Sequence, residues 1–394
     1  MTVIAGPNLY TPGLVFAYDM GNPERSWKGA PTTNLTPNLG ISTVLGAPTV
    51  TYVGLEDGWK KYSLSGTWTG GTYPYSVAID SVSFTGGVTY SSGVYIRTSV
   101  PAKFATLFTG MNYVNEPMNN AGTSFSTLQP DGSFFVGRSG FQYTNTTPQP
   151  GYILSQPVVG QTFNSATDFI FIKDGQVQTG SFPTPFTSGT RSNTQALLDL
   201  TGTNTITTNT LTYASNNTFS FDGVDDFIST SAISGLGTST NSITWCIWTR
   251  PNGTAGNIMS MASANPVGGW NMPPIAATGS QFRGKIWSNN YLFSSTYTIG
   301  VWYYVCLVFN YDPVTANAFQ RLYVNGDLTA EQTGITYSSS GVDNFLFFGQ
   351  ANPGADNTGF YTGSIGAVQV YSGRALTQEQ IRQNFDAYRT RYGV

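Results

Sequence analysis

Gly and Pro interrupt this chain so often that its apolar residues occur only in short stretches. The 394 residues include 45 Gly and 21 Pro, and the longest apolar run, residues 301–309, has nine residues. The stretches between are rich in Val, Ile, Thr, Tyr, Phe and Trp, which favour strands. Nine apolar residues fall far short of the roughly 20 that a membrane-spanning helix needs. The pattern therefore predicts an all-β protein built of sandwiches, with no membrane insertion.

Two segments of the second half, 242–249 and 302–309, are predicted to be central strands. Large residues alternate on both faces of each segment, as expected of strands that are covered on both sides. Cys246 and Cys306 lie in the middle of these segments, as buried free thiols or as a cross-strand bridge, and a cytoplasmic site of assembly favours free thiols. Turn residues Asn325-Gly326 and Asn289-Asn290 predict hairpins.

One helix is predicted near the carboxyl end. Thr377 with Gln380 forms a capping-box pattern, which marks a helix start. Ile381, Phe385 and Tyr388 then follow at the spacing of one helix face. This apolar stripe is expected to pack on the edge or the back of the preceding sandwich.

The missing and scattered residue types exclude several kinds of active site. The chain has no histidine, which removes Ser-His-Asp and Cys-His catalysis and histidine-containing zinc sites. Charged residues make up 9%, and 17 basic against 20 acidic residues give a net charge of −3 without any basic run. A nucleic-acid binder needs a basic patch, so nucleic acid is not an expected partner. No amino-terminal signal-peptide pattern is present, and assembly in a cytoplasm is expected.

Five segments of the second half, taken together, carry a family resemblance. They are SFDGVDDFI at 220–228, ITWCIW at 243–248, WYYVCLVF at 302–309, LYVNG at 322–326, and GSIGAVQVY at 363–371 with RALT at 374–377. In this order and spacing they resemble the laminin-G-like, concanavalin-A-like jelly-roll family. The resemblance covers residues 211–391 and implies two facing antiparallel sheets.

The amino-terminal segment carries a second resemblance. Residues 13–23, GLVFAYDMGNP, are similar to the opening strand of such jelly rolls in structural proteins of tailed bacteriophages, where a segment like 197–202 follows soon after. Here about 170 residues intervene, and their end, 169–186, resembles carbohydrate-binding-module-like sandwiches. The domains expected are an amino-terminal segment 1–30 whose first strand completes the carboxy-terminal jelly roll, an inserted β-sandwich 31–190, and a laminin-G-like jelly roll with a terminal helix, 191–394.

Aromatic residues in glycine-rich loops and at a predicted hairpin tip are the candidate glycan-binding residues. Sugar rings stack on aromatic faces, while amide side chains bond the hydroxyl groups. The alternative is that each ring anchors its own loop or packs against a neighbouring subunit. The candidates are Trp270, Asn271, Trp287, Asn289, Tyr291, Phe360 and Tyr361.

Asp222, Asp225 and Asp226 form the one acidic cluster of the sequence. Clustered carboxylates suit calcium, but Asp222-Gly223 also fits a turn in which an Asp side chain bonds nearby backbone amides. The turn is preferred, and no cofactor is expected. Acids paired at alternating strand positions are missing, so glycoside hydrolysis is not expected.

These resemblances imply a non-enzymatic bacteriophage virion protein: a capsid-attached fibre or decoration, or a tail fibre. Its expected partners are other virion proteins, further copies of itself and a host cell-surface glycan, which it binds weakly and multivalently. Its expected location is the surface of the virion, after assembly in the host cytoplasm. Two alternatives remain: a glycan-degrading tail depolymerase, and a purely structural capsid cement protein without a ligand.

Overall fold

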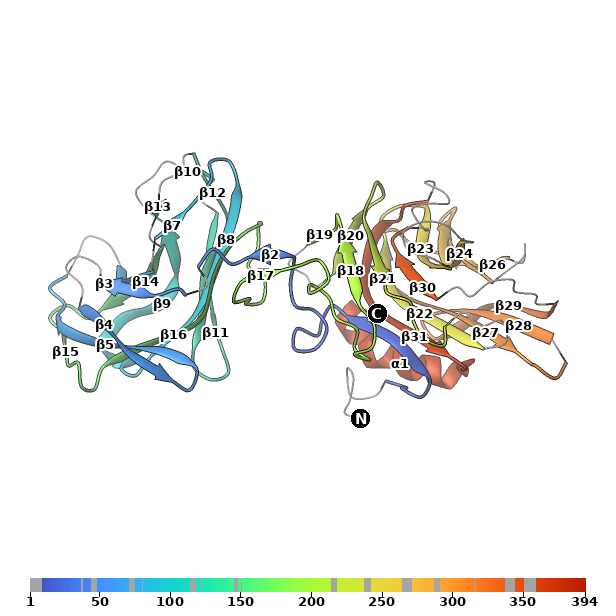
Figure 1. Ribbon diagram of the computed structural model, residues 1–394, viewed down its shortest axis with the longest axis horizontal. Coiled ribbons are helices and arrows are strands. Elements are labelled where there is room, and N and C mark those ends of the chain that lie inside the picture. Colours follow the sequence, from blue (N-terminus) through green and yellow to red (C-terminus); the bar gives the residue numbers. More distant parts are fainter. Residues whose placement is uncertain are drawn as a thin grey trace. The chain divides into compact units, whose positions relative to one another are not determined.

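The fold is nearly all β, as predicted, and the described residues include one α-helix, near the carboxyl end (Figure 1). A computed structural model describes residues 9–36, 38–43, 48–70, 75–79, 81–113, 118–120, 122–144, 148–149, 151–213, 218–236, 242–263, 271–286, 291–315, 317–336, 344–350 and 359–394. The chain divides into two compact units. The terminal unit comprises Met1–Ala30 and Ser192–Val394, and the middle unit comprises Pro31–Arg191.

The middle unit is a sandwich of two antiparallel sheets. Sheet III has the order β10-β12-β8-β16-β5-β15, with β11 on β12 and β4 on β5, and sheet IV has the order β3-β6-β14-β9. Its elements are β2 Thr32–Thr33, β3 Ile41–Thr43, β4 Thr49–Glu56, β5 Trp59–Thr67, β6 Tyr75–Ile79, β7 Val82–Ser83, β8 Thr89–Thr98, the 3-10 helix Pro101–Lys103, β9 Phe104–Tyr113, β10 Met118–Asn120, β11 Thr123–Leu128, β12 Phe134–Tyr143, β13 Pro148–Gln149, β14 Gly151–Pro157, β15 Thr162–Phe163, β16 Phe169–Thr179 and β17 Thr190–Arg191. The short strands β2 and β17 pair, so both ends of this unit lie side by side.

The terminal unit is a second antiparallel sandwich. Sheet I has the order β19-β20-β31-β22-β27-β28-β29 with β1 also on β31, and sheet II has the order β18-β21-β30-β23-β24-β25-β26. Its elements are β1 Leu14–Asp19, β18 Ile206–Asn209, β19 Thr212–Tyr213, β20 Phe219–Asp222, β21 Phe227–Thr230, β22 Ile243–Pro251, β23 Ala255–Ala262, β24 Asn271–Thr278, β25 Gln281–Lys285, β26 Tyr291–Thr296, β27 Tyr303–Tyr311, β28 Asn317–Val324, β29 Asp327–Thr336, β30 Phe345–Phe348, β31 Thr362–Ser372 and α1 Gln378–Tyr392.

Strands β22 and β27 are central in sheet I, as predicted, because a separate apolar layer covers each face. Trp245 lies in the core between the two sheets, whereas Trp248 lies in the layer beneath α1. Cys246 and Cys306 are direct cross-strand neighbours and are free, buried thiols. Burial raises the pKa of the Cys306 thiol well above its ordinary value, and a buried neutral thiol is chemically inert.

The amino-terminal strand β1 is built into sheet I. It pairs antiparallel with β31, with Leu14 opposite Tyr371 and Asp19 opposite Ala367. A bridge between Trp27 and Leu197 then holds together the two places at which the chain leaves and re-enters the terminal unit. The first strand of the chain is thus an interior part of the terminal unit.

Helix α1 packs on the back of sheet I, one of the two positions predicted for it. It begins with the predicted capping box, in which the Thr377 hydroxyl accepts from the backbone N–H of Gln380. Phe385 was predicted to be in the buried stripe, but it is only partly buried, stacked 5.6 Å from the ring of Trp248. Asn384 is fully buried instead, because its side chain accepts from the Tyr10 N–H at 2.8 Å and donates to the Tyr371 hydroxyl at 2.9 Å.

The predicted Asn325-Gly326 turn joins β28 to β29, and both residues have positive φ, 52° and 86°. Strands β25 and β26 also pair as a hairpin; the turn predicted at Asn289-Asn290 lies outside the described residues. Among the residues that the structure describes, no helix combines the length and the apolar character needed to cross a membrane.

Candidate functional site

The structure describes the side chains of only some of the predicted glycan-binding residues. Trp270, Trp287 and Asn289 lie outside the described residues, and Asn271 is the first residue of β24, its side chain also outside them. Phe360 is half-buried.

Tyr361 does not present its ring to a ligand. It is 1% exposed and lies in the core between the sheets, with its hydroxyl 2.6 Å from the Thr249 hydroxyl. Burial raises its pKa far above the ordinary tyrosine value. The alternative prediction, that the ring anchors its own loop, fits this residue.

Tyr291 belongs to an exposed aromatic and cationic face on the outside of sheet II. In β26, Leu292 and Ser294 point inward, so Tyr291 and Phe293 point outward and are 41% and 43% exposed. Their ring centroids are 6.2 Å apart. Because strand side chains alternate between faces, both rings lie on one surface.

The neighbouring strand β25 adds two cations to this surface. The Arg283 guanidinium lies 5.3 Å from the Tyr291 ring centroid, and the Lys285 Nζ lies 4.8 Å from it. The Lys285 ammonium also donates to the Tyr291 hydroxyl at 3.3 Å. We call the surface formed by Arg283, Lys285, Tyr291 and Phe293 the β25–β26 face.

The β25–β26 face carries two positive charges and, among the described residues, no acid that neutralises them. In the part of the chain that the structure describes, neither Arg283 nor Lys285 forms an ion pair, and the buried Nε of Arg283 has no hydrogen-bond partner. Burial lowers the pKa of the Arg283 guanidinium. Two rings for stacking and several unused N–H donors are the groups that hold a sugar and its oxygen substituents.

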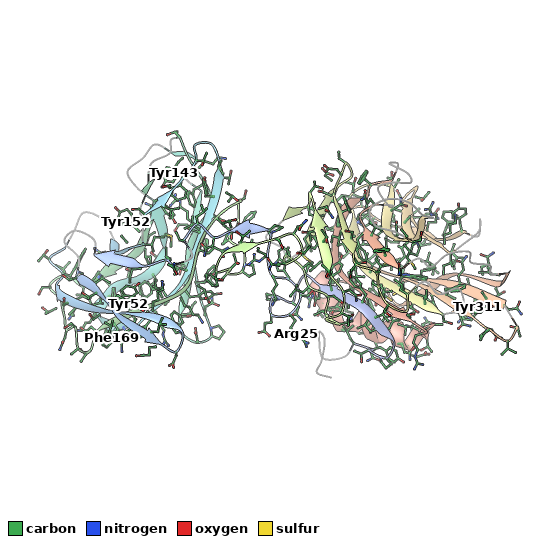
Figure 2. All side chains as sticks on the ribbon, in the orientation of Figure 1. Arg25, Tyr52, Tyr143, Tyr152, Phe169 and Tyr311 are labelled. Atoms are coloured by element: carbon green, nitrogen blue, oxygen red, sulfur yellow. The ribbon has the colours of Figure 1, made fainter. Side chains whose placement is uncertain are left out.

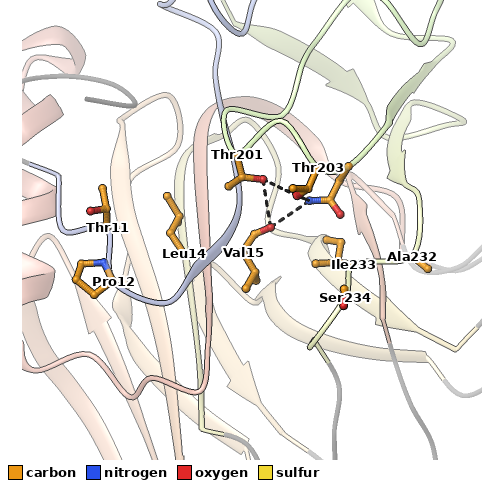
Figure 3. A pocket seen from close by; sticks show the side chains of 10 residues that line it. Thr11, Pro12, Leu14, Val15, Thr201, Thr203, Ala232, Ile233 and Ser234 are labelled. Carbon is orange, nitrogen blue, oxygen red and sulfur yellow. Dashed lines mark hydrogen bonds between the residues drawn. The ribbon is translucent and has the colours of Figure 1, made fainter. Parts of the chain in front are cut away.

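A pocket of about 520 Å³ lies elsewhere in the terminal unit, beside β1 (Figure 3). Its wall includes the backbone carbonyl of Val15, which accepts from the Asn204 side chain at 3.1 Å and from the Thr201 hydroxyl. The lining residues are Thr11, Pro12, Leu14, Val15, Thr201, Thr203, Asn204, Ala232, Ile233 and Ser234. This lining holds no titratable side chain and no aromatic ring, so it offers neither acid–base chemistry nor sugar stacking.

The acidic cluster contains the predicted turn, and its carboxylates also lie close together. Asp222 makes the predicted turn, because its carboxylate accepts from the backbone N–H of Val224 at 2.7 Å. Asp226 is buried and accepts from the Asp222 N–H at 2.9 Å. Carboxylate oxygens of Asp222, Asp225 and Asp226 also lie within 4.8 Å of one another, close enough to share a cation. Burial, together with the two neighbouring charges, raises the pKa of Asp226 to about 6.

The sequence pattern pointed to Tyr291 as a candidate but not to Arg283, Lys285 or Phe293. The sequence contains the signal for them. In Arg-Gly-Lys at 283–285 and in Tyr-Leu-Phe at 291–293, the first and third residues are two positions apart, which places them on the same face of a strand. Pairing Lys285 opposite Tyr291 places all four side chains on one face.

Comparison with known proteins supports the fold of the terminal unit. Residues 222–382 match a family described as the concanavalin A-like lectin/glucanases superfamily. No curated protein matches the chain. The terminal unit therefore contains a laminin-G-like, concanavalin-A-like domain, as predicted.

Several solved structures are similar at low identity. The binding domain of botulinum neurotoxin serotype G is 16% identical with a TM-score of 0.36, over 48% of this chain and 48% of that one. The serotype D ligand-binding domain in complex with N-acetylneuraminic acid is 15% identical with a TM-score of 0.36, over 50% and 49%. A heptameric SAP-like pentraxin from Limulus polyphemus is 18% identical with a TM-score of 0.32, over 41% and 78%. The chain spans about half the length of the neurotoxin domains.

Proposed function

We propose that this chain is a non-enzymatic adhesion protein whose laminin-G-like unit binds cell-surface glycan through the β25–β26 face. The observation that carries the proposal is the pair of exposed rings, Tyr291 and Phe293, beside the cations Arg283 and Lys285, which form no ion pair with any described residue. All four side chains stand on paired strands, which hold them in fixed positions. A shallow face of this kind binds weakly, and many copies together raise the total affinity.

We further propose that the protein works on a bacteriophage virion, as a capsid-attached fibre or decoration or as a tail fibre. The resemblance of residues 13–23 to phage jelly-roll strands supports this, and so does a surface built from uncharged polar residues, since only 9% of the residues are charged. Its partners are then other virion proteins and further copies of itself. Quantitative mass spectrometry of purified virions tests the proposal: hundreds of copies per particle indicate the capsid, and a few to a few dozen indicate the tail.

The proposed binding is tested by replacing one ring. Tyr291→Ala in protein clustered on beads is expected to lower adhesion to host cells, or signal on a glycan array, about fivefold or more, because each small loss is multiplied across copies. The matched control is Tyr52→Ala, which removes an aromatic ring 53% exposed in the middle unit. Equal adhesion of wild type and Tyr291→Ala at unchanged melting temperature contradicts the proposal. No array signal at any protein density supports the structural cement protein instead.

One observation favours a second candidate, the glycan-degrading depolymerase. Retaining glycosidases use two carboxyl groups about 5 Å apart, one with a raised pKa, and the cluster of Asp222, Asp225 and Asp226 has both properties. The turn hydrogen bonds at Asp222 and the exposure of Asp222 and Asp225 favour a structural role. Release of reducing ends from host capsule or lipopolysaccharide that disappears in Asp226→Asn would establish the enzyme.

A further inference from the structure

The outer face of sheet III in the middle unit carries a second group of cations and aromatic rings. Across the strands, Phe171 on β16 lies opposite Arg97 on β8, and Lys173 lies opposite Tyr95. We call Trp59, Tyr95, Arg97, Phe171 and Lys173 the Trp59 site. The Arg97 guanidinium lies 4.7 Å from the Trp59 ring and 4.8 Å from the Phe171 ring, and the Lys173 Nζ lies 4.7 Å from Trp59 and 5.5 Å from Tyr95. Both cations are therefore held in place by stacking on the same buried Trp59.

These two cations lack an acceptor within the described part of the chain. The Arg97 Nε is buried without a hydrogen-bond partner, and neither Arg97 nor Lys173 is in an ion pair. Lys61 lies over the ring of Phe169, the residue labelled in Figure 2, and differs because Glu56 neutralises it at 2.7 Å. Asp131 and Asp174 are near enough for their charges to raise the pKa of Tyr95, after the larger effect of burial. The charges of Lys173 and Arg97 also help to lower the pKa of Asp131, after its hydrogen bonds with Ser133. Among the described residues, neither acid forms an ion pair with the two cations.

A stacked arginine in the terminal unit shows which kind of ligand a guanidinium on an aromatic ring binds. Arg321 lies 4.3 Å from the Phe319 ring centroid, and its guanidinium holds the Glu331 carboxylate at 2.8 Å. The edge of a stacked guanidinium matches a carboxylate with two parallel N–H donors. Arg97 has the same stacking but binds no carboxylate of the described residues.

We propose that Arg97 and Lys173 bind the carboxylate of an acidic polysaccharide, such as a chain of uronic or sialic acid. Beside them, the Phe135 ring lies 4.7 Å from that of Tyr95. Phe135 packs over Gly93, where an added Cβ would lie 2.6 Å from the ring. Phe135, which is half-buried and also contacts the Phe125 ring at 5.5 Å, thus extends the aromatic surface beside the two cations, on which the sugar that carries the carboxylate can stack.

The charge of the middle unit favours a polysaccharide over a nucleic acid. Residues 31–191 contain seven basic and seven acidic side chains, which cancel, and the Trp59 site contributes two cations rather than a row of them. A phosphodiester chain needs a continuous row of cations along its backbone, whereas an acidic sugar needs one carboxylate receptor and one ring to stack on. This site goes beyond the β25–β26 face and can be tested separately from it.

The test measures retention of the full chain on three immobilised probes: polygalacturonate, alginate and polysialic acid. Fully methyl-esterified polygalacturonate is the matched uncharged control. Wild-type protein is expected to bind at least one acidic probe, to lose binding as salt rises, and to ignore the ester. Arg97→Lys keeps the charge but loses the two-donor edge, and about tenfold weaker binding is expected. Lys173→Met is expected to weaken binding several-fold.

Two controls separate this site from the rest of the chain. Arg321→Lys changes a stacked arginine that already holds Glu331, and Tyr52→Ala removes an exposed ring of the middle unit outside the Trp59 site; both are expected to leave retention unchanged. Equal binding to the ester, no binding to any acidic probe, or unchanged binding by Arg97→Lys and Lys173→Met would overturn the proposal. Preferential binding of oligothymidylate would overturn it in favour of a nucleic acid. If the melting temperature of Arg97→Lys is more than about 2 °C below that of the wild type, its binding loss is not used. The retention of Lys173→Met on the acidic probes then decides whether the proposal holds.

Discussion

The buried carboxyl group of Asp226 makes the stability of the terminal unit depend on pH. Its pKa is about 6 in the folded protein and close to 3.9 in an unfolded chain, so the folded state binds the proton more tightly. Between about pH 4 and pH 6 the free energy of unfolding is therefore expected to fall as pH rises, by up to about 3 kcal/mol. Urea denaturation at a series of pH values measures this fall.

Asp226→Asn is the control for that titration. The amide keeps an oxygen that can accept the Asp222 N–H but cannot ionise, so the pH dependence between 4 and 6 is expected to flatten. An undiminished fall in the variant would assign the effect to another group. If calcium binds the cluster, millimolar calcium raises the melting temperature of the wild type at pH 7 and has less effect on Asp226→Asn.

Residue-level prediction from the sequence succeeded where local pattern decides and failed where tertiary contacts decide. Asn325-Gly326 has to adopt positive φ whatever surrounds it, so its turn was predictable. Tyr361 lies among glycines, which suggests exposure, yet its burial depends on Thr249, more than 100 residues away. The stacking of Arg97 on Trp59 likewise depends on strand order, which alternation alone does not give.

At the scale of the element, the cap of α1 has a measurable effect. Thr377→Ala removes the hydroxyl that accepts from the Gln380 N–H and is expected to lower the free energy of unfolding of the terminal unit by about 1 kcal/mol. Thr377→Ser keeps a hydroxyl and is expected to be nearly neutral. Denaturant unfolding of both variants measures the free energy of unfolding. If Thr377→Ala and Thr377→Ser lower it equally, the capping hydroxyl contributes nothing to stability.

The helix also shows which part of an element the sequence predicts. Local rules predict where the helix starts, from its capping box, and that Ile381 and Tyr388 share one buried face. The exchange of roles between Phe385 and Asn384 does not, because Asn384 is buried only where Tyr10 and Tyr371 supply its hydrogen bonds. One of these partners lies near the start of the chain.

For the whole molecule, the paired chain crossings predict that the terminal unit folds without the middle unit. The bridge between Trp27 and Leu197, with the Lys28 N–H donating to Ala196 at 2.9 Å, keeps the two crossing points together. Deleting 31–191 and joining Ala30 to Ser192 is therefore expected to give a folded protein with one cooperative melting transition. Calorimetry of the deletion variant checks this, and an aggregated product without a transition would contradict it.

The pairing of β1 with β31 also sets an order of events during synthesis. The ribosome makes β1 about 350 residues before the partner strand, which at bacterial and eukaryotic elongation rates is a delay of roughly 20 to 70 s. The whole middle unit emerges within that interval and can complete its own sandwich. During this interval the apolar strand β1 has no partner strand on the nascent chain. It is therefore exposed as a binding segment for a chaperone that recognises extended apolar chain, until β31 is synthesised.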